Sequence, residues 1–209
     1  MTGAVTLPGD HDPLPIVQCG DPVLRRAAEL VEPSALHTPE LRHLIAQMRT
    51  TMELAPGVGL AAPQVGVSLQ LAVLQDGPQQ WGRLSDDERA ARERRYLPFT
   101  VLVNPMVQPV EDERISFYEG CLSVPGLTGV VARHRAVRVE ALDQDGQPID
   151  QVFSGCAARI VQHEFDHLRG RLYLDHVQPR SLSTLDNYAS RWAGRPTHDA
   201  AESLGFPLD

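Results

Sequence analysis

The sequence predicts an α+β fold, in which mainly antiparallel sheets pack around a central helix within a single domain. Three observations support this prediction. The expected elements run in the order helix, several strands, then helices, which differs from the strict alternation of a doubly wound α/β fold. Short turns join consecutive strands, as is usual for antiparallel neighbours. The 209 residues, of which 42% are hydrophobic, suffice for one core of ordinary size, and the sequence contains no internal repeat.

The first helix is expected to begin after Thr38, because threonine is a common N-cap residue and a proline follows it at the first helical position. Apolar side chains then recur at helical spacing up to Met52, and the Pro-Gly pair at 56–57 ends the helix. In segment 68–74, apolar side chains alternate with other residues, which predicts a strand.

The polar segment 76–97 is interpreted as a surface insertion whose charges face solvent. Within it, Ser85 and Glu88 have the spacing of a capping box, which predicts a short charged helix. The chain is accordingly divided into a flexible N-terminal arm at 1–15, a domain at 16–195 and a C-terminal tail at 196–209.

The later strands are expected at 100–104, where Pro105 ends the strand, and at 130–132, 136–142 and 149–153. Residues 143–146 form the hairpin turn between the last two. Ser154 is expected to cap the helix that follows, and Gly170 to end it. A last helix is predicted at 183–191, closed by Gly194.

Composition and charge narrow the functional classes. The sequence has no run of about 18 apolar residues and no secretory signal at its N-terminus, so neither a membrane span nor export is expected. Its three cysteines, Cys19, Cys121 and Cys156, are too few for a disulfide framework and favour a reducing, cytoplasmic compartment. A net charge of −8 argues against stable binding to nucleic acid, although not against a brief encounter.

The most informative segment is 162–170, Gln-His-Glu-Phe-Asp-His-Leu-Arg-Gly. His163 and His167 are four residues apart, so on a helix both imidazoles face the same way and can bind one metal ion. Glu164 is near enough to handle a proton on water at that ion, which points to metal-assisted hydrolysis. The alternative is a surface helix with two chance histidines. It is less favoured because the motif lies on an otherwise apolar helix face, where polar side chains need partners.

A cysteine is the expected third ligand. Cys156 precedes His163 by seven residues on the same helix, about 10 Å along the axis, which is too far for a shared ion. Cys19 lies in an early loop without other metal-binding residues. Cys121 lies in the turn-rich segment 119–126, whose backbone can direct a thiolate towards a distant helix. Cys121 is therefore the best candidate.

Segment 57–64, Gly-Val-Gly-Leu-Ala-Ala-Pro-Gln, is the third candidate for a functional role. Its glycines allow a ligand to approach the backbone closely, and the Gln64 amide is able to donate to a substrate oxygen. The alternative is a tight connection after the first helix. The segment has no lysine and no phosphate-loop spacing, which argues against nucleotide binding.

Together these three segments resemble the signatures of the peptide deformylase family. The family patterns are Gly-x-Gly-Leu-Ala-Ala-x-Gln, Glu-Gly-Cys-Leu-Ser and Gln-His-Glu-x-Asp-His-Leu-x-Gly. Each occurs here once and in the family's order, at 57–64, 119–123 and 162–170. The resemblance covers roughly residues 16–190.

The resemblance implies a hydrolase with one divalent metal ion per chain, which removes the N-formyl group from the initiator formyl-methionine of nascent chains and releases formate. It implies Fe²⁺ as the working ion, with Zn²⁺, Ni²⁺ or Co²⁺ able to replace it. The implied partners are N-formyl-methionyl peptides and nascent chains, together with a brief contact to the ribosome.

The resemblance also assigns roles to residues. Cys121, His163 and His167 would bind the metal, with water in the fourth position, and Glu164 would be the general acid and base. The Gln64 amide and the Leu122 N–H would bond the formyl oxygen. The substrate would be bound by Val58, Gly59, Phe117 and Ile160: Gly59 beside its backbone, and the other three around the methionine side chain.

Some positions depart from the family pattern. Pro63 occupies the variable position of the first motif, and segment 127–129 lacks an arginine that many members carry near the peptide-binding cleft. The 76–97 insertion resembles the longer connection of some actinobacterial and organellar members. Asp166 has no role next to the metal. We predict that it pairs with Arg133 beneath the helix, and the alternative is an aspartate exposed to solvent.

Two other functional classes compete with this interpretation. A metalloprotease can use the same helix motif, but it usually takes a histidine or a glutamate as third ligand. The cysteine and the Gln64 loop therefore favour a formyl substrate. An inactive binding module is disfavoured because every residue expected around the metal is present.

Overall fold

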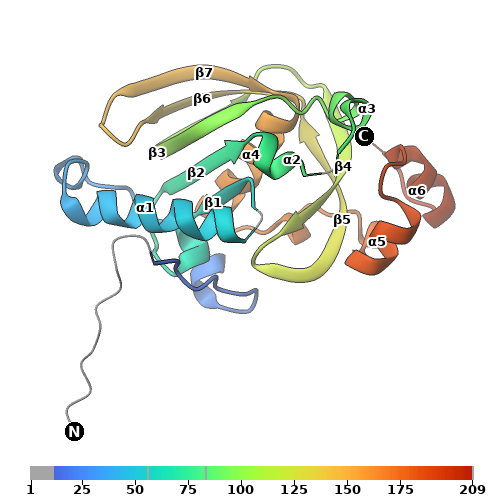
Figure 1. Ribbon diagram of the computed structural model, residues 1–209, viewed down its shortest axis with the longest axis horizontal. Coiled ribbons are helices and arrows are strands. Elements are labelled where there is room, and N and C mark those ends of the chain that lie inside the picture. Colours follow the sequence, from blue (N-terminus) through green and yellow to red (C-terminus); the bar gives the residue numbers. More distant parts are fainter. Residues whose placement is uncertain (1–11, 56, 83, 209) are drawn as a thin grey trace, which may run out of the picture.

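The computed structural model of the chain describes residues 12–55, 57–82 and 84–208 (Figure 1). Residues 1–11 of the predicted N-terminal arm lie outside this part of the chain. Residues 12–15 lie along the first helix: the Leu14 N–H donates to Thr51 Oγ1 at 2.8 Å, and the Gln47 side chain donates to the Asp12 carbonyl at 3.3 Å.

Two antiparallel sheets form the framework. The larger has the strand order β1-β2-β3-β6-β7, with β1 at Gly59–Ala61, β2 at Leu71–Asp76, β3 at Leu97–Pro109, β6 at Ala136–Leu142 and β7 at Pro148–Ser154. The smaller has the order β4-β5-β8, with β4 at Arg114–Cys121, β5 at Val124–His134 and β8 at Ser183–Thr184. Helix α4, Gly155–Leu168, contacts strands of both sheets. The α+β class and the central helix are therefore confirmed.

Helix α1, Pro39–Leu54, lies beside β1 and β2 of the larger sheet (Figure 1). Thr38 caps it as predicted, with its hydroxyl accepting the Leu41 N–H at 3.3 Å. The buried face of the helix joins the largest core cluster, against β1, β2 and β3. Its fully buried Met48 and Met52 each contribute about 1.5–3 kcal/mol of hydrophobic stabilisation.

Strand β3 does not end at Pro105 as the sequence predicted. It continues to Pro109 through an irregularity, where the register with β6 shifts between Val103 and Met106. Asn104 adopts a φ of 51° there, and its side chain bonds the Val31 N–H at 2.8 Å and the Val31 carbonyl at 2.9 Å. A proline lacks the N–H that a regular ladder needs, so this bulge is what accommodates it.

The hairpin of β4 and β5 was missed in part. The predicted strand at 130–132 covers only three residues in the C-terminal half of β5, and β4 was not predicted. The strand pattern of β4 is obscured by charged and glycine residues near its end, although residues 115, 117, 119 and 121 share one face. The strands predicted at 136–142 and 149–153 agree with β6 and β7, and the strand predicted at 68–74 overlaps β2 but begins three residues before it.

The shorter helices complete the chain. They are α2 at Pro78–Trp81, α3 at Asp86–Ala91, α5 at Leu185–Arg191 and α6 at Thr197–Leu204, with 3-10 turns η1 at Pro22–Arg25, η2 at Pro33–Ala35, η3 at Ala62–Val65, η4 at Tyr173–Asp175 and η5 at Pro179–Ser181. The capping box of α3 is confirmed, because Ser85 and Glu88 bond each other reciprocally at 3.2 and 2.8 Å. Ser154 precedes α4, but its side chain makes no capping bond.

Part of the segment predicted as a C-terminal tail is helical and packs on β5. Helix α6 buries Ala200 and Ala201, and Phe206 follows them into the same cluster against Val130 of β5. The 76–97 insertion likewise has buried ends, since Asp76 is only 1% exposed and Leu97 only 7%. No helix in the described ranges is long and apolar enough to cross a bilayer.

Candidate active site

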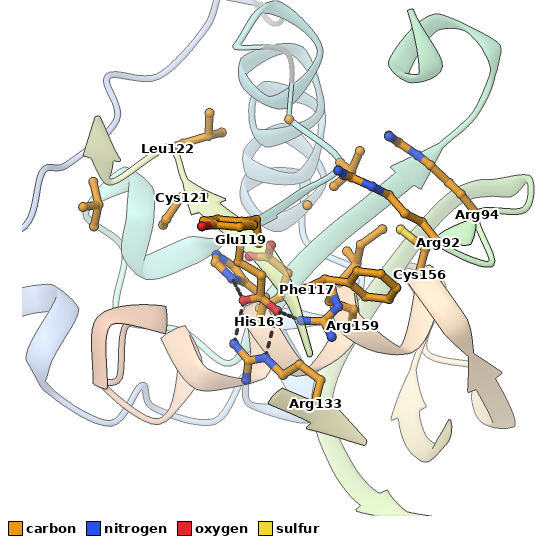
Figure 2. Close-up of a pocket in the computed structure, with 18 of the residues that line it drawn as sticks. Arg92, Arg94, Phe117, Glu119, Cys121, Leu122, Arg133, Cys156, Arg159 and His163 are labelled. Atoms are coloured by element: carbon orange, nitrogen blue, oxygen red, sulfur yellow. Dashed lines mark hydrogen bonds and ion pairs between the residues drawn. The ribbon is translucent and has the colours of Figure 1, made fainter. Parts of the chain in front are cut away.

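Three ligand-type side chains meet between α4 and the end of β4. His163 and His167 lie one turn apart on α4, with ring centroids separated by 5.1 Å. Cys121 is the last residue of β4, where the register with β5 shifts, and its Sγ lies 3.3 Å from His167 Nε2. The three ligand atoms all lie within 4.8 Å of one another. Figure 2 shows Cys121 and His163 at one end of the cavity.

The chemistry of this cluster fits a divalent transition metal. A thiolate and two imidazoles are ligands that zinc and iron both accept. His163 Nδ1 is bonded to Glu119 Oε2 at 3.1 Å, so its other ring nitrogen is free for an ion. His167 is fully buried, and its Nδ1 has no hydrogen-bond partner among the described residues, which leaves Nε2 directed at the thiol.

Glu164 lies beside the cluster and is only 4% exposed. Burial raises the pKa of this carboxyl to about 7, and its Oε2 bonds no other described residue. A Cβ at Gly59 of β1 would overlap the Glu164 carboxyl, so the glycine is needed for this close approach. A buried carboxyl that titrates near neutrality is suited to accept a proton and to return it.

Gln64 lies in η3 on the other side of the cluster and is only 1% exposed. Its Oε1 accepts the Ala61 N–H at 2.9 Å, which fixes the orientation of the amide. Its Nε2 then points at Ser123 Oγ, at 3.3 Å, and at Cys121 Sγ, at 3.6 Å. The predicted glutamine therefore reaches the cluster with a donor group.

The cluster opens into a cavity of about 530 Å³. Every residue predicted to bind substrate lies on its wall, namely Val58, Gly59, Phe117 and Ile160, and Leu122 lies there as well. Cys156, which sequence analysis excluded as a ligand, lines the wall away from the cluster (Figure 2). Burial raises the pKa of its thiol to about 11, so it stays protonated and neutral at neutral pH.

Beneath the histidines lies an ion network centred on Glu119. The predicted pair is confirmed, with Arg133 Nη1 at 2.5 Å from Asp166 Oδ2. Arg133 also forms a two-pronged bond to Glu119, at 3.0 and 3.1 Å, and Arg159 bonds Glu119 at 2.6 Å (Figure 2). Neither contact was predicted from the sequence.

Burial alone would raise the pKa of Glu119. The charges of Arg133 and Arg159 and the bond to His163 outweigh it, and they hold the pKa well below its usual range. Glu119 is therefore an anion that also orients a candidate ligand. The sequence offered only the closeness of Glu119 to Cys121, two residues apart; the role of Glu119 depends on β4, which was not predicted.

Replacing Arg133 with alanine is expected to destabilise the protein by about 3–5 kcal/mol, because the buried Glu119 loses a two-pronged partner and the largely buried Asp166 loses its shortest ion pair. KM should change much less, since the Arg133 guanidinium is directed at the carboxylates of Glu119 and Asp166 although the residue lines the cavity. Urea unfolding of metal-free protein measures the first effect. The control is Arg138→Ala on β6, whose pair with Asp150 is about half exposed and should be worth less than about 1 kcal/mol. Equal losses in the two variants would contradict the prediction.

Comparison with known proteins agrees with this geometry. A family model described as polypeptide deformylase matches residues 13–183. Peptide deformylase 1 of Streptomyces coelicolor is 51% identical over 197 residues, which cover 94% of this chain and 88% of that protein. Peptide deformylase 1 of Bifidobacterium longum is 44% identical over 201 residues, covering 96% and 89%.

The fold matches solved structures as well. The class I type b peptide deformylase of Acinetobacter baumannii, bound to Met-Ala-Ser, superposes with a TM-score of 0.72 at 34% identity, over 80% of this chain and 99% of that one. A peptide deformylase of Synechococcus elongatus in complex with actinonin gives a TM-score of 0.68 at 36% identity, over 93% and 89%. The chain therefore belongs to the polypeptide deformylase family.

Proposed function

We propose that this enzyme removes the formyl group from the initiator N-formyl-methionine of nascent polypeptides and releases formate, using a metal ion held by Cys121, His163 and His167. One observation carries the assignment of the site: the three ligand atoms lie within 4.8 Å of one another at the wall of a cavity that also contains Glu164. The Met-Ala-Ser peptide bound to the Acinetobacter relative supports a methionyl peptide as the ligand.

Different residues of the chain have separate roles in this reaction. Glu164 takes a proton from the attacking water and delivers it to the leaving amine, for which its pKa near neutrality is suited. The Gln64 amide and the Leu122 N–H donate to the formyl oxygen as negative charge builds there, and one such donor is typically worth about 3 kcal/mol. Gly59 lies beside the substrate backbone. Val58, Phe117 and Ile160 surround the methionine side chain.

The ion is proposed to be Fe²⁺, with Zn²⁺, Ni²⁺ or Co²⁺ able to replace it. When bound, it supplies a Lewis acid and lowers the pKa of water towards neutrality. A thiolate beside two imidazoles suits each of these ions, and ferrous iron beside a thiolate is expected to be sensitive to oxygen. Metal analysis of protein prepared without air should therefore find one iron per chain, and activity should fall on exposure to air.

A formate-release assay tests the proposed reaction. Protein loaded with metal under anaerobic conditions is expected to release one formate per N-formyl-Met-Ala-Ser, and to leave the peptide bonds intact by mass spectrometry. Acetyl-Met-Ala-Ser serves as the matched control substrate. Cleavage of a peptide bond would favour a metalloprotease instead, and freshly metallated protein that released no formate would refute the proposal.

We also propose that the enzyme acts in the cytoplasm, on nascent chains, and that it contacts the ribosome only briefly. The substrate supports this location, because formyl-methionine is present at the start of a chain as it is made. The net charge of −8 supports a weak contact with RNA rather than a stable complex. Co-sedimentation with ribosomes should accordingly be lost in about 0.2 M salt.

A further inference from the structure

The 76–97 insertion contributes three consecutive residues, Arg92, Glu93 and Arg94, to the wall of the active-site cavity. The sequence predicted that these charges face solvent. In Figure 2, Arg92 and Arg94 lie on the opposite side of the cavity from Cys121 and Leu122. The insertion therefore takes part in forming the substrate cavity.

Two contacts hold the end of the insertion against the core. Arg94 makes a two-pronged ion pair with the buried Asp76, at 2.8–3.0 Å. The neighbouring Glu93 adopts a φ of 49° and packs on Gly155, where a Cβ would meet the Glu93 backbone at 2.8 Å. Glu93 and Arg94, the two residues that follow Arg92, are thus both fixed against the core. The position of Arg92 on the cavity wall is therefore well defined.

Arg92 differs from the other arginines on the wall in its partners. Arg94, Arg133, Arg135 and Arg159 each form ion pairs with carboxylates. The side chain of Arg92 instead donates to a neutral group, Tyr188 Oη, at 2.7 Å. Within the described residues it forms no ion pair, and Glu88, one turn earlier, bonds Ser85. The Glu88 carboxylate still attracts Arg92 through space. Among the described residues, Arg92 is nevertheless the arginine of the cavity wall that forms no ion pair.

The position of Arg92 indicates which part of a substrate meets it. Tyr188 belongs to α5, which has no buried residue, so Arg92 lies where the cavity meets the surface. Arg92 lies across the cavity from Cys121 (Figure 2), and Phe117, one of the residues proposed to surround the methionine, lines the same cavity. An extended peptide advances about 3.3 Å per residue, so the residues that follow the methionine are the ones able to reach this edge.

We propose that Arg92 is a specificity-determining residue, which binds the carboxylate of an aspartate or glutamate at one of the two positions after the formyl-methionine. This inference rests on the proposed function. A half-buried guanidinium already oriented by Tyr188 loses little further freedom on forming such an ion pair.

Matched peptides test this proposal. The value of kcat/KM is measured for N-formyl-Met-Asp-Ser against N-formyl-Met-Asn-Ser, and for N-formyl-Met-Ala-Asp against N-formyl-Met-Ala-Asn. The wild-type enzyme is expected to favour the acidic peptide of one pair by about fivefold, the upper end for an ion pair near a protein surface. This ratio should fall towards 1 in the Arg92→Gln variant. It should also fall towards 1 in the wild-type enzyme at about 0.5 M salt, which screens the ion pair.

The control variant is Arg95→Gln, which removes the same charge from an exposed residue of the insertion that is not on the cavity wall. It should leave the ratio unchanged. A ratio near 1 for both pairs in the wild-type enzyme would overturn the proposal. So would a ratio that survives Arg92→Gln, or one that Arg95→Gln lowers equally.

The uncharged peptide N-formyl-Met-Ala-Ser tests the proposed function separately, because its turnover does not involve this preference. If it releases no formate, calorimetric binding of the same two peptide pairs to the metal-loaded protein still yields the acid-to-amide ratio. A binding ratio near 1 then overturns the inference, and a ratio that Arg92→Gln abolishes supports it.

Discussion

Replacing Glu164 with glutamine is expected to lower kcat for formyl-peptide hydrolysis by about 10²–10⁴-fold while the protein retains its metal. Glutamine has nearly the same shape, but its amide cannot accept a proton from water and return it to an amine. The three ligand atoms of Cys121, His163 and His167 do not include Glu164. Formate release gives the rate, and metal analysis of anaerobic protein gives the occupancy.

The control for this variant is Glu53→Gln on α1, where a carboxylate paired with Arg49 is exposed at the surface. It should retain full activity. Loss of metal from Glu164→Gln would reassign this residue to the ligand set, and retention of more than about a tenth of the wild-type kcat would refute its role as the proton carrier.

The same variant has an expected effect on stability. Since burial raises the pKa of Glu164 to about 7, the folded protein holds this proton more tightly than the unfolded chain does. The free energy of unfolding of metal-free wild-type protein should therefore fall as pH rises from about 4.5 to about 7. Glu164→Gln removes this contribution, so at pH 8 the metal-free variant should be the more stable, by at most about 3 kcal/mol. A pH series of urea unfolding checks the sign.

Replacing Glu119 with glutamine should both destabilise the fold and weaken metal binding. Arg133 and Arg159 would share a buried site without this carboxylate, and losing one partner of a buried pair typically costs about 3–5 kcal/mol. His163 would lose the anionic partner of its Nδ1, and such losses typically weaken metal affinity by about 10–100-fold.

Urea unfolding of metal-free protein and competition for zinc with a chelator measure these two effects. Asp150→Asn is the control, because it breaks an exposed ion pair to Arg138 far from the cluster. It should alter neither quantity by much. If zinc affinity is unchanged in Glu119→Gln, the bond to His163 does not orient the ligand.

Local sequence patterns predicted several features of the fold and of the candidate site. The spacing of His163 and His167 follows from the helical repeat, and the cap at Thr38 depends on a bond to a residue only three positions away. Cys121 required a further step, namely the distance argument that excluded Cys156. The structure brings Cys121, His163 and His167 together as the sequence predicted, because the inferences depend on contacts within a few residues or on the fixed rise of a helix; their role as metal ligands stays a prediction.

Other features depend on which distant segments pack together. Glu119 reaches Arg133, Arg159 and His163 only through the pairing of β4 with β5 and the placement of α4 against them. The extension of β3 past Pro105 depends on Asn104 bonding Val31, which is 73 residues away. Chain composition does not determine such register and pairing.

The sequence by itself determined the α+β class, the helix with two histidines and a glutamate, and the family that these motifs indicate. Only the tertiary structure showed that two segments rich in polar residues pack on the core. Helix α6 buries alanines against β5, and the ion pair between Asp76 and Arg94 fixes the insertion beside the cavity. The physical reason is that a charged side chain has the same composition whether water or an opposite charge surrounds it. The fold decides whether water or an opposite charge surrounds a given side chain. In this fold Arg92 lines the active-site cavity and bonds Tyr188.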